Sequence, residues 1–142
     1  MYGMKIKLCL ATMIVASIVT SNGLANDIVK RVVFPKGENT VVYKGKLPHE
    51  YASYHAYVIK LRRGQRLTVT LTTDDAHAFF SIYETKRLGP DEDLIFDSKP
   101  DQSEFSGIAP ITSEYSIQIY GVREFDDKPS RAAYSVEITV SN

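Results

Sequence analysis

Residues 54–72 read YHAYVIKLRRGQRLTVTLT, and this stretch decides the fold class. Apolar side chains occupy every second position on both sides of the tight connection Arg63-Gly64-Gln65. They are Tyr57, Ile59 and Leu61 before the connection, and Leu67, Val69 and Leu71 after it. Such a period of two is typical of a β-strand with one buried face. The stretch therefore predicts two strands, which we expect to pair as a hairpin.

The same alternation recurs along the chain, and helical periodicity does not. Half-buried antiparallel strands produce this pattern because one face packs on the core and the other meets water. About eight short strands separated by turn signals predict an all-β fold, an antiparallel β-sandwich of two packed sheets. The predicted strands are residues 29–34, 40–47, 54–61, 67–72, 78–83, 94–96, 115–120 and 134–140.

Composition favours one globular domain. The chain has 142 residues, of which 44% are hydrophobic and 24% charged, so it is too apolar for intrinsic disorder. A chain of this size can form a core that needs no metal or disulfide. Its 17 basic and 17 acidic residues leave no global charge to attract nucleic acid or an acidic membrane surface.

Residues 1–25 have the three parts of a secretory signal peptide. Lys5 and Lys7 precede an apolar run over residues 8–19, and small residues stand at positions 23 and 25, before Asn26. The run is too short for a membrane-spanning helix, so no membrane span is expected after cleavage. Residues 26–142 then form a single sandwich domain, and we expect it in the periplasm.

Removal of the signal peptide also removes the one cysteine, Cys9, which leaves no thiol for a disulfide, a metal or a nucleophile. The remaining domain has 15 basic and 17 acidic residues, a net charge of −2.

Catalytic chemistry has no clear sequence signal. His49, His55 and His77 lack the spacing of a zinc motif, and the acidic pairs and triplets lack that of a calcium loop. No serine stands in a nucleophile elbow. A carboxylate pair of the glycosidase kind is invisible in sequence, but nothing singles out one pair. We therefore predict no enzyme, no catalytic residue, no metal and no cofactor.

Two loops are candidates for binding. Tyr51 falls in the polar segment 48–53, where an aromatic side chain can anchor an interface. The connection between Gly121 and Ala133 is long for so small a domain, and it contains Arg123 and Arg131. A mobile surface loop explains that length equally well.

The layout resembles the periplasmic inhibitors of goose-type lysozyme of Gram-negative bacteria. The matching stretches cover nearly the whole mature chain: residues 33–37 (VFPKG), 43–45 (YKG), 54–57 (YHAY), 64–65 (GQ), 115–117 (YSI), Arg123 and 134–138 (YSVEI). The Gly-Gln turn and the Tyr-x-Val strand also look like the pre-peptidase C-terminal domains of secreted enzymes. Both families imply a β-sandwich, whereas only the first implies lysozyme inhibition by loops that plug the substrate cleft.

The resemblance to the inhibitors also implies a contact surface. It consists of a loop tyrosine, a Ser-Gly-x-Tyr segment and two arginines four residues apart in the long loop. The tyrosine matches Tyr51 and the first arginine matches Arg123. The segment reads Thr112-Ser113-Glu114-Tyr115, without the glycine but with hydroxyls. Asp127 stands where the second arginine is expected, and Arg131 is the nearest substitute.

These observations predict a secreted protein that binds a protein partner, a lysozyme or another peptidoglycan-cleaving enzyme. The partner-binding residues are then Tyr51, Thr112, Ser113, Arg123 and Arg131. Three alternatives remain open: a module that binds a glycan or small ligand, a structural protein of the envelope, and an immunity protein against another antibacterial effector. A glycan binder is expected to expose aromatic side chains in a row on one sheet. An inhibitor is expected to gather them on adjoining loops.

Export makes a direct prediction. Amino-terminal sequencing of the protein recovered outside the cytoplasm is expected to begin at Asn26. A mature chain that still contains Cys9 would contradict the signal peptide and the absence of thiols together.

Overall fold

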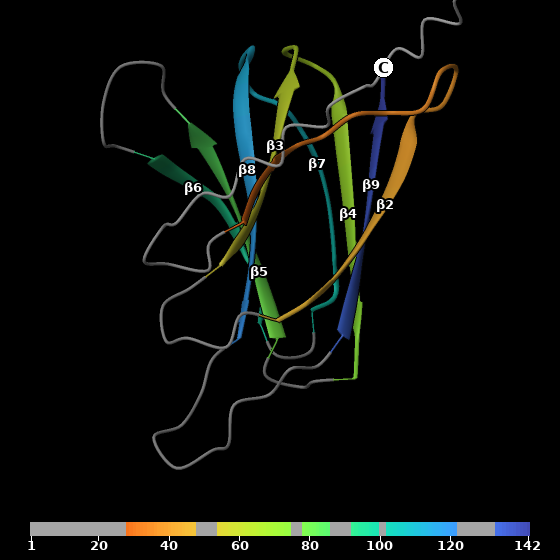
Figure 1. Cartoon of the computed structure of the whole chain (residues 1–142). Helices are drawn as coiled ribbons and strands as arrows, with labels where there is room; N and C mark the ends of the chain where they lie inside the picture. Colours follow the sequence, from red (N-terminus) through yellow and green to blue (C-terminus); the bar gives the residue numbers. More distant parts are fainter. Residues whose placement is uncertain (1–27, 48–53, 75–77, 86–91, 100–101, 122–132) are drawn as a thin grey trace, which may run out of the picture.

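The computed structural model describes residues 28–47, 54–74, 78–85, 92–99, 102–121 and 133–142. Every regular element in these ranges is a β-strand (Figure 1). The strands are β1 (Ile28–Arg31), β2 (Thr40–Lys46), β3 (His55–Leu61), β4 (Arg66–Thr73), β5 (Ala78–Thr85), β6 (Glu92–Asp97), β7 (Glu104–Ile108), β8 (Ser113–Gly121) and β9 (Ala133–Ser141). Within these ranges no helix is long and apolar enough to span a membrane.

The strands form two sheets that pack face to face (Figure 1). The five-stranded sheet has the order β1-β3-β8-β5-β6, and the four-stranded sheet has the order β2-β9-β4-β7. All neighbours are antiparallel except β1, which runs parallel to β3. The predicted all-β sandwich is confirmed.

The core lies between the two sheets and consists of the alternating apolar positions. Tyr57, Ile59 and Leu61 of β3 are buried, as are Leu67, Val69 and Leu71 of β4. The same holds for the inward positions of the other central strands: Phe80 and Ile82 of β5, Tyr115, Ile117 and Ile119 of β8, and Tyr134, Val136 and Ile138 of β9. The inward faces that we predicted for β3 and β4 are therefore confirmed.

The predicted hairpin between β3 and β4 is wrong. β3 pairs with β1 and β8, whereas β4 pairs with β9 and β7 in the other sheet. The turn at residues 62–65 is an arch that carries the chain from one sheet to the other. Gly64 adopts a positive φ of 91°, and its amide donates to the carbonyl of Ala109. Ala109 in turn donates to the carbonyl of Gln65, which extends the pairing of β4 with β7 instead of closing a hairpin.

One strand was missed and another was misplaced. β7 has the pattern EFSGI, in which the inward positions are Phe105 and a glycine while Ile108 points outward and is exposed. The Phe105 ring lies against Gly107, where a Cβ would come within 2.5 Å of it. A strand whose second inward position is a glycine gives little apolar alternation. The first strand was predicted at 29–34, but β1 ends at Arg31.

Burial of Val69 makes a stability prediction. Val69 is 0% exposed, and Val69→Ala is expected to lower the free energy of unfolding by about 2 kcal/mol through lost burial and a residual cavity. Thr70→Ala, on the outward face of β4, is expected to cost less than about 1 kcal/mol. Chemical denaturation of both variants measures this, and equal losses would mean that the assigned faces are wrong.

Candidate functional site

Besides residues 98–103, which lead from β6 to β7, three connections between the sheets lie at one end of the sandwich, which we call the crossover end. β2 leads to β3 through residues 47–54, β4 leads to β5 through residues 74–77, and β8 leads to β9 through residues 122–132. Each passes from one sheet to the other. Because β2 and β9 are neighbours in one sheet and β3 and β8 in the other, the first and third connections join adjacent pairs of strands. This end faces downward in Figure 1.

Strand registers fix the flanks of these connections side by side. Lys46, at the end of β2, is opposite Ala133, at the start of β9. His55, at the start of β3, is opposite Ile119, near the end of β8. Ala78, at the start of β5, is opposite Gly121. The sandwich therefore supplies one rigid base for all three connections.

A buried polar cluster joins the two sheets at this base. The hydroxyl of Tyr134 on β9 lies 2.7 Å from the hydroxyl of Tyr57 and 2.7 Å from Nδ1 of His55, both on β3. Tyr43 of β2 stacks on Tyr57 with ring centroids 4.9 Å apart. The Tyr43 hydroxyl accepts a hydrogen bond from the amide of Val33. The Tyr134 hydroxyl thus links the four-stranded sheet to His55, the first residue of β3.

Packing around Tyr134 is close. Its ring lies over Gly45 of β2, where a Cβ would stand 2.8 Å from the tyrosine oxygen. Burial raises the pKa of Tyr134 well above the ordinary value, and the hydrogen bond with Tyr57 raises it further. Burial also raises the pKa of Tyr57. Both hydroxyls therefore stay neutral in the physiological pH range and act as hydrogen-bonding groups, not as charged ones.

Three of the five predicted binding residues are carried by the connections at the crossover end. Tyr51, Arg123 and Arg131 lie outside the described residues, as does Asp127. The strands that flank their segments are described, and they bring the ends of the two segments together.

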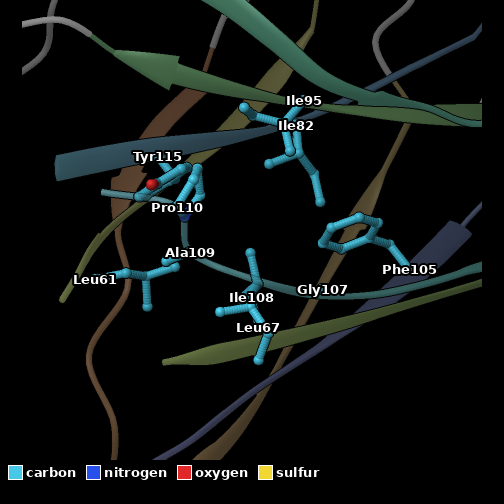
Figure 2. A pocket seen from close by; sticks show the side chains of 10 residues that line it. All are labelled: Leu61, Leu67, Ile82, Ile95, Phe105, Gly107, Ile108, Ala109, Pro110 and Tyr115. Atoms are coloured by element: carbon cyan, nitrogen blue, oxygen red, sulfur yellow. The ribbon is translucent and has the colours of Figure 1, made fainter. Parts of the chain in front are cut away.

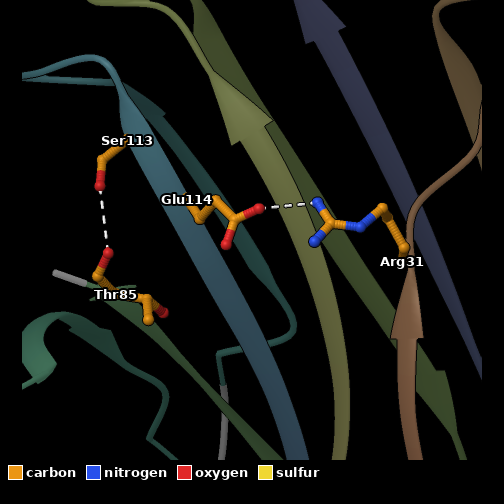
Figure 3. A network of polar contacts seen from close by, with 4 residues as sticks. All are labelled: Arg31, Thr85, Ser113 and Glu114. Carbon is orange, nitrogen blue, oxygen red and sulfur yellow. Dashed lines mark hydrogen bonds and ion pairs between the residues drawn. The ribbon is translucent and has the colours of Figure 1, made fainter. Parts of the chain in front are cut away.

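Thr112 and Ser113 lie at the opposite end. Ser113 begins β8 and is opposite Leu61, six residues along the strand from the His55–Ile119 pair, or about 20 Å. The Ser113 hydroxyl donates to the carbonyl of Thr85 (Figure 3). The Thr112 hydroxyl accepts a hydrogen bond from the amide of Arg63 in the arch. Both hydroxyls thus hold neighbouring chain segments, and neither lies near the flanks of the two loops.

The residues that follow have local partners too. Glu114 forms an ion pair with Arg31 of β1, with the nitrogen and oxygen 2.7 Å apart, and the arginine side chain reaches across β3 (Figure 3). The two side chains are 65% and 39% exposed, so this pair contributes little stability. Tyr115 is buried, and its hydroxyl donates to the carbonyl of Ile111. In this structure residues 112–115 thus connect neighbouring strands and the arch.

An apolar groove opens between the edge strands β6 and β7 (Figure 2). Ile95 lines it because the pairing of β5 with β6 shifts register there, which leaves this residue unpaired between Leu94 and Phe96. Phe105 and Ile108 line the other side, and Tyr115 closes one end. The only hydroxyl among the lining side chains is that of Tyr115, which is already bonded to Ile111. The described lining of the groove thus offers apolar contacts and no free polar or charged side chain for catalysis.

Among the described residues, no group of three or more His, Cys, Asp or Glu side chains is placed to hold a metal ion. His55 is bonded to Tyr134, while His49 and His77 lie outside the described ranges. The Tyr134 cluster was not anticipated as a site. Its residues were predicted only as strand positions, and the one further signal in the sequence is a tyrosine in each of three strands, Tyr43, Tyr57 and Tyr134.

The fold is that of the periplasmic inhibitors of g-type lysozyme. Alignment with the PliG inhibitor of Aeromonas hydrophila gives a TM-score of 0.69 at 19% identity and covers 81% of this chain and 97% of that one. For PliG of Salmonella Typhimurium the TM-score is 0.56 at 22% identity, over 80% and 98% of the two chains. For a mutant of the Escherichia coli PliG it is 0.56 at 20% identity, over 82% and 100%.

A pre-peptidase C-terminal domain of a Bacillus anthracis collagenase is also similar, with a TM-score of 0.52 at 9% identity over 84% and 99% of the chains. No family model and no curated protein matches the chain by sequence. Both resemblances expected from the sequence are therefore confirmed at the level of the fold.

The Tyr134 cluster makes a prediction about stability. Tyr134→Phe is expected to lower the free energy of unfolding by about 1–3 kcal/mol, because it leaves the buried Tyr57 hydroxyl and His55 Nδ1 without this partner. Tyr83→Phe is the matched control, since the Tyr83 hydroxyl has no hydrogen bond within the described part of the chain. Urea denaturation measures both, and an equally small loss in both variants would show that the cluster does not join the sheets.

Proposed function

We propose that this protein is a periplasmic inhibitor of lysozyme, of the kind that acts on the goose type, and is not itself an enzyme. The observation that carries the proposal is the likeness of fold to three g-type lysozyme inhibitors over at least 97% of their length. Inhibition follows from occlusion: loops on a rigid sandwich fill the glycan-binding cleft and exclude the substrate.

The crossover end suits this action. Two connections, which contain Tyr51 in one and Arg123 and Arg131 in the other, start and finish on neighbouring strands held together by Tyr134. A rigid base reduces the conformational entropy that its loops lose on binding. Glycoside hydrolases work with paired carboxylates, and an arginine can bind a carboxylate through two parallel hydrogen bonds. We therefore assign Arg123 to a carboxylate of the cleft and Tyr51 to an apolar contact beside it.

The proposal leaves out Thr112 and Ser113. Their hydroxyls are bonded to the arch and to β5, about 20 Å along β8 from the flanks of the two loops. Their place in the contact surface stays a prediction from resemblance alone.

Arg123→Ala tests the proposal. Truncation is expected to weaken binding to a goose-type lysozyme by about 30-fold, the equivalent of about 2 kcal/mol for a desolvated arginine at an interface. The thermal midpoint is expected to stay unchanged. Arg63→Ala, which removes an exposed arginine from the arch at the opposite end, is the matched control and is expected to inhibit like the wild type. The measurement is hydrolysis of cell walls by the lysozyme, titrated with each variant.

A charge reversal gives the complementary arm of the same titration. Asp127→Arg restores the charge expected from the resemblance and is expected to strengthen inhibition. The proposal fails if the folded wild-type protein leaves goose-type, chicken-type and invertebrate-type lysozymes fully active at about 10 µM.

A further inference from the structure

The outer face of the five-stranded sheet carries aromatic side chains on β5 and β8, beside Leu94 and Asp97 of β6. Phe80 and Ile82 of β5 point into the core, so Phe79, Ser81 and Tyr83 point outward. Phe79 is opposite Tyr120 of β8, and their rings lie 6.0 Å apart between centroids, with an angle of 27° between the planes. Both side chains are half-buried. The two nearly parallel rings thus stack across the strands and form one partly exposed aromatic surface, which we call the platform.

The aromatic surface continues toward the edge of the sheet. Tyr83, four residues after Phe79 on β5, is half-buried, and it is close enough to Tyr120 to raise the pKa of that hydroxyl. Opposite Tyr83, Leu94 of β6 is 55% exposed. These strands are neighbours at the outer side of the sheet (Figure 1). None of these side chains is needed to fill the core.

A carboxylate with a fixed orientation stands beside the platform. Asp97 is exposed, and its Oδ1 accepts hydrogen bonds from the hydroxyl of Ser81, at 2.5 Å, and from the hydroxyl of Tyr120, at 2.9 Å. Ser81 is only 1% exposed, so it holds the carboxylate from beneath. In the described part of the chain, Oδ2 has no hydrogen bond or ion pair. One oxygen is therefore held in place and the other remains able to accept.

Tyr120 contributes both its ring and its hydroxyl to this arrangement. Its ring is half of the platform, and its hydroxyl orients Asp97. Burial raises the pKa of Tyr120, and the Asp97 carboxylate raises it further, so the phenol remains protonated and donates at neutral pH. The rings, the buried serine and the carboxylate form one connected arrangement with donors and acceptors already in place.

The chemistry of this surface selects a ligand. Partly exposed aromatic rings are suited to the C–H face of a pyranose, and the second oxygen of a carboxylate accepts hydrogen bonds from sugar hydroxyls or amides. The same carboxylate repels phosphate, sulfate and uronic acid groups, and the net charge of −2 on the mature chain adds to this. We propose that Phe79, Tyr120 and Asp97 form a binding site for a neutral oligosaccharide, whose sugar rings stack on the platform while a hydroxyl or amide bonds to Asp97.

This site uses other residues than the proposed contact with lysozyme, although the Phe79–Tyr120 pair lies next to the Ala78–Gly121 pair at the crossover end. It lies on the flat outer face of a sheet and uses none of Tyr51, Arg123 or Arg131. The two proposals therefore stand or fall on different measurements.

The site is tested by titration with two neutral probes, chitotetraose and cellotetraose. Calorimetry and NMR chemical shifts measure the binding. We expect at least one probe to bind with a Kd in the millimolar range or below, and to shift the signals of residues 79–83, 97 and 120. Preference for chitotetraose would identify an N-acetylated sugar as the ligand, and equal binding would identify the pyranose ring itself. No binding of either probe at about 10 mM, or shifts confined to other surfaces, would overturn the proposal.

Variants separate the contributions of the ring and the carboxylate. Phe79→Ala is expected to raise the Kd by about tenfold and Asp97→Asn by about fivefold. Glu137→Gln, which changes an exposed carboxylate on β9 of the other sheet, is the matched control and is expected to have no effect. All three are expected to melt cooperatively and to inhibit lysozyme like the wild type. Unchanged glycan binding in folded Phe79→Ala would contradict the proposal, whatever the result with lysozyme.

Discussion

The hydroxyl of Tyr134 forms a polar link between the two sheets at the crossover end. It contacts Tyr57 and His55 across the sandwich, while Gly45 leaves room for its ring. A buried hydroxyl needs partners, so the contact holds β9 against β3 in one arrangement. The strands that carry the connections at residues 48–53 and 122–132 are thereby fixed relative to each other. Whatever those connections bind, they bind from a base whose geometry depends on this contact.

Alternation predicted the faces of the strands but not their partners. Leu67, Val69 and Leu71 are buried as expected, because one apolar face is what any half-buried strand requires. The same pattern is compatible with a hairpin and with an arch between sheets, so the assumed pairing of β3 with β4 was wrong. The arch depends on bonds from Gly64 and Gln65 to Ala109, a residue more than 40 positions away. Local sequence carries no signal for such a contact, nor for β7 with its inward glycine.

The candidate sites also depend on strand pairing that the local sequence does not indicate. Sequence and resemblance singled out the loops that contain Tyr51 and Arg123, and the strand order brings the flanks of these loops to one end. They also grouped Thr112 and Ser113 with those loops, although the register of β8 puts these two residues at the opposite end. The proposed oligosaccharide site combines Phe79 of β5, Tyr120 of β8 and Asp97 of β6. Its residues are 41 positions apart at most, but only strand order and the outward faces make them neighbours.

Hydrogen exchange of the chain, alone and with an excess of goose-type lysozyme, tests the central claim most directly. The claim is that the crossover end is the surface that meets the enzyme. The account predicts slower exchange on binding at the amides of residues 48–53 and 122–132, with little change at the arch, residues 62–65, or at residues 112–113. Protection confined to the arch end, or no change anywhere while the enzyme is in excess, would contradict it.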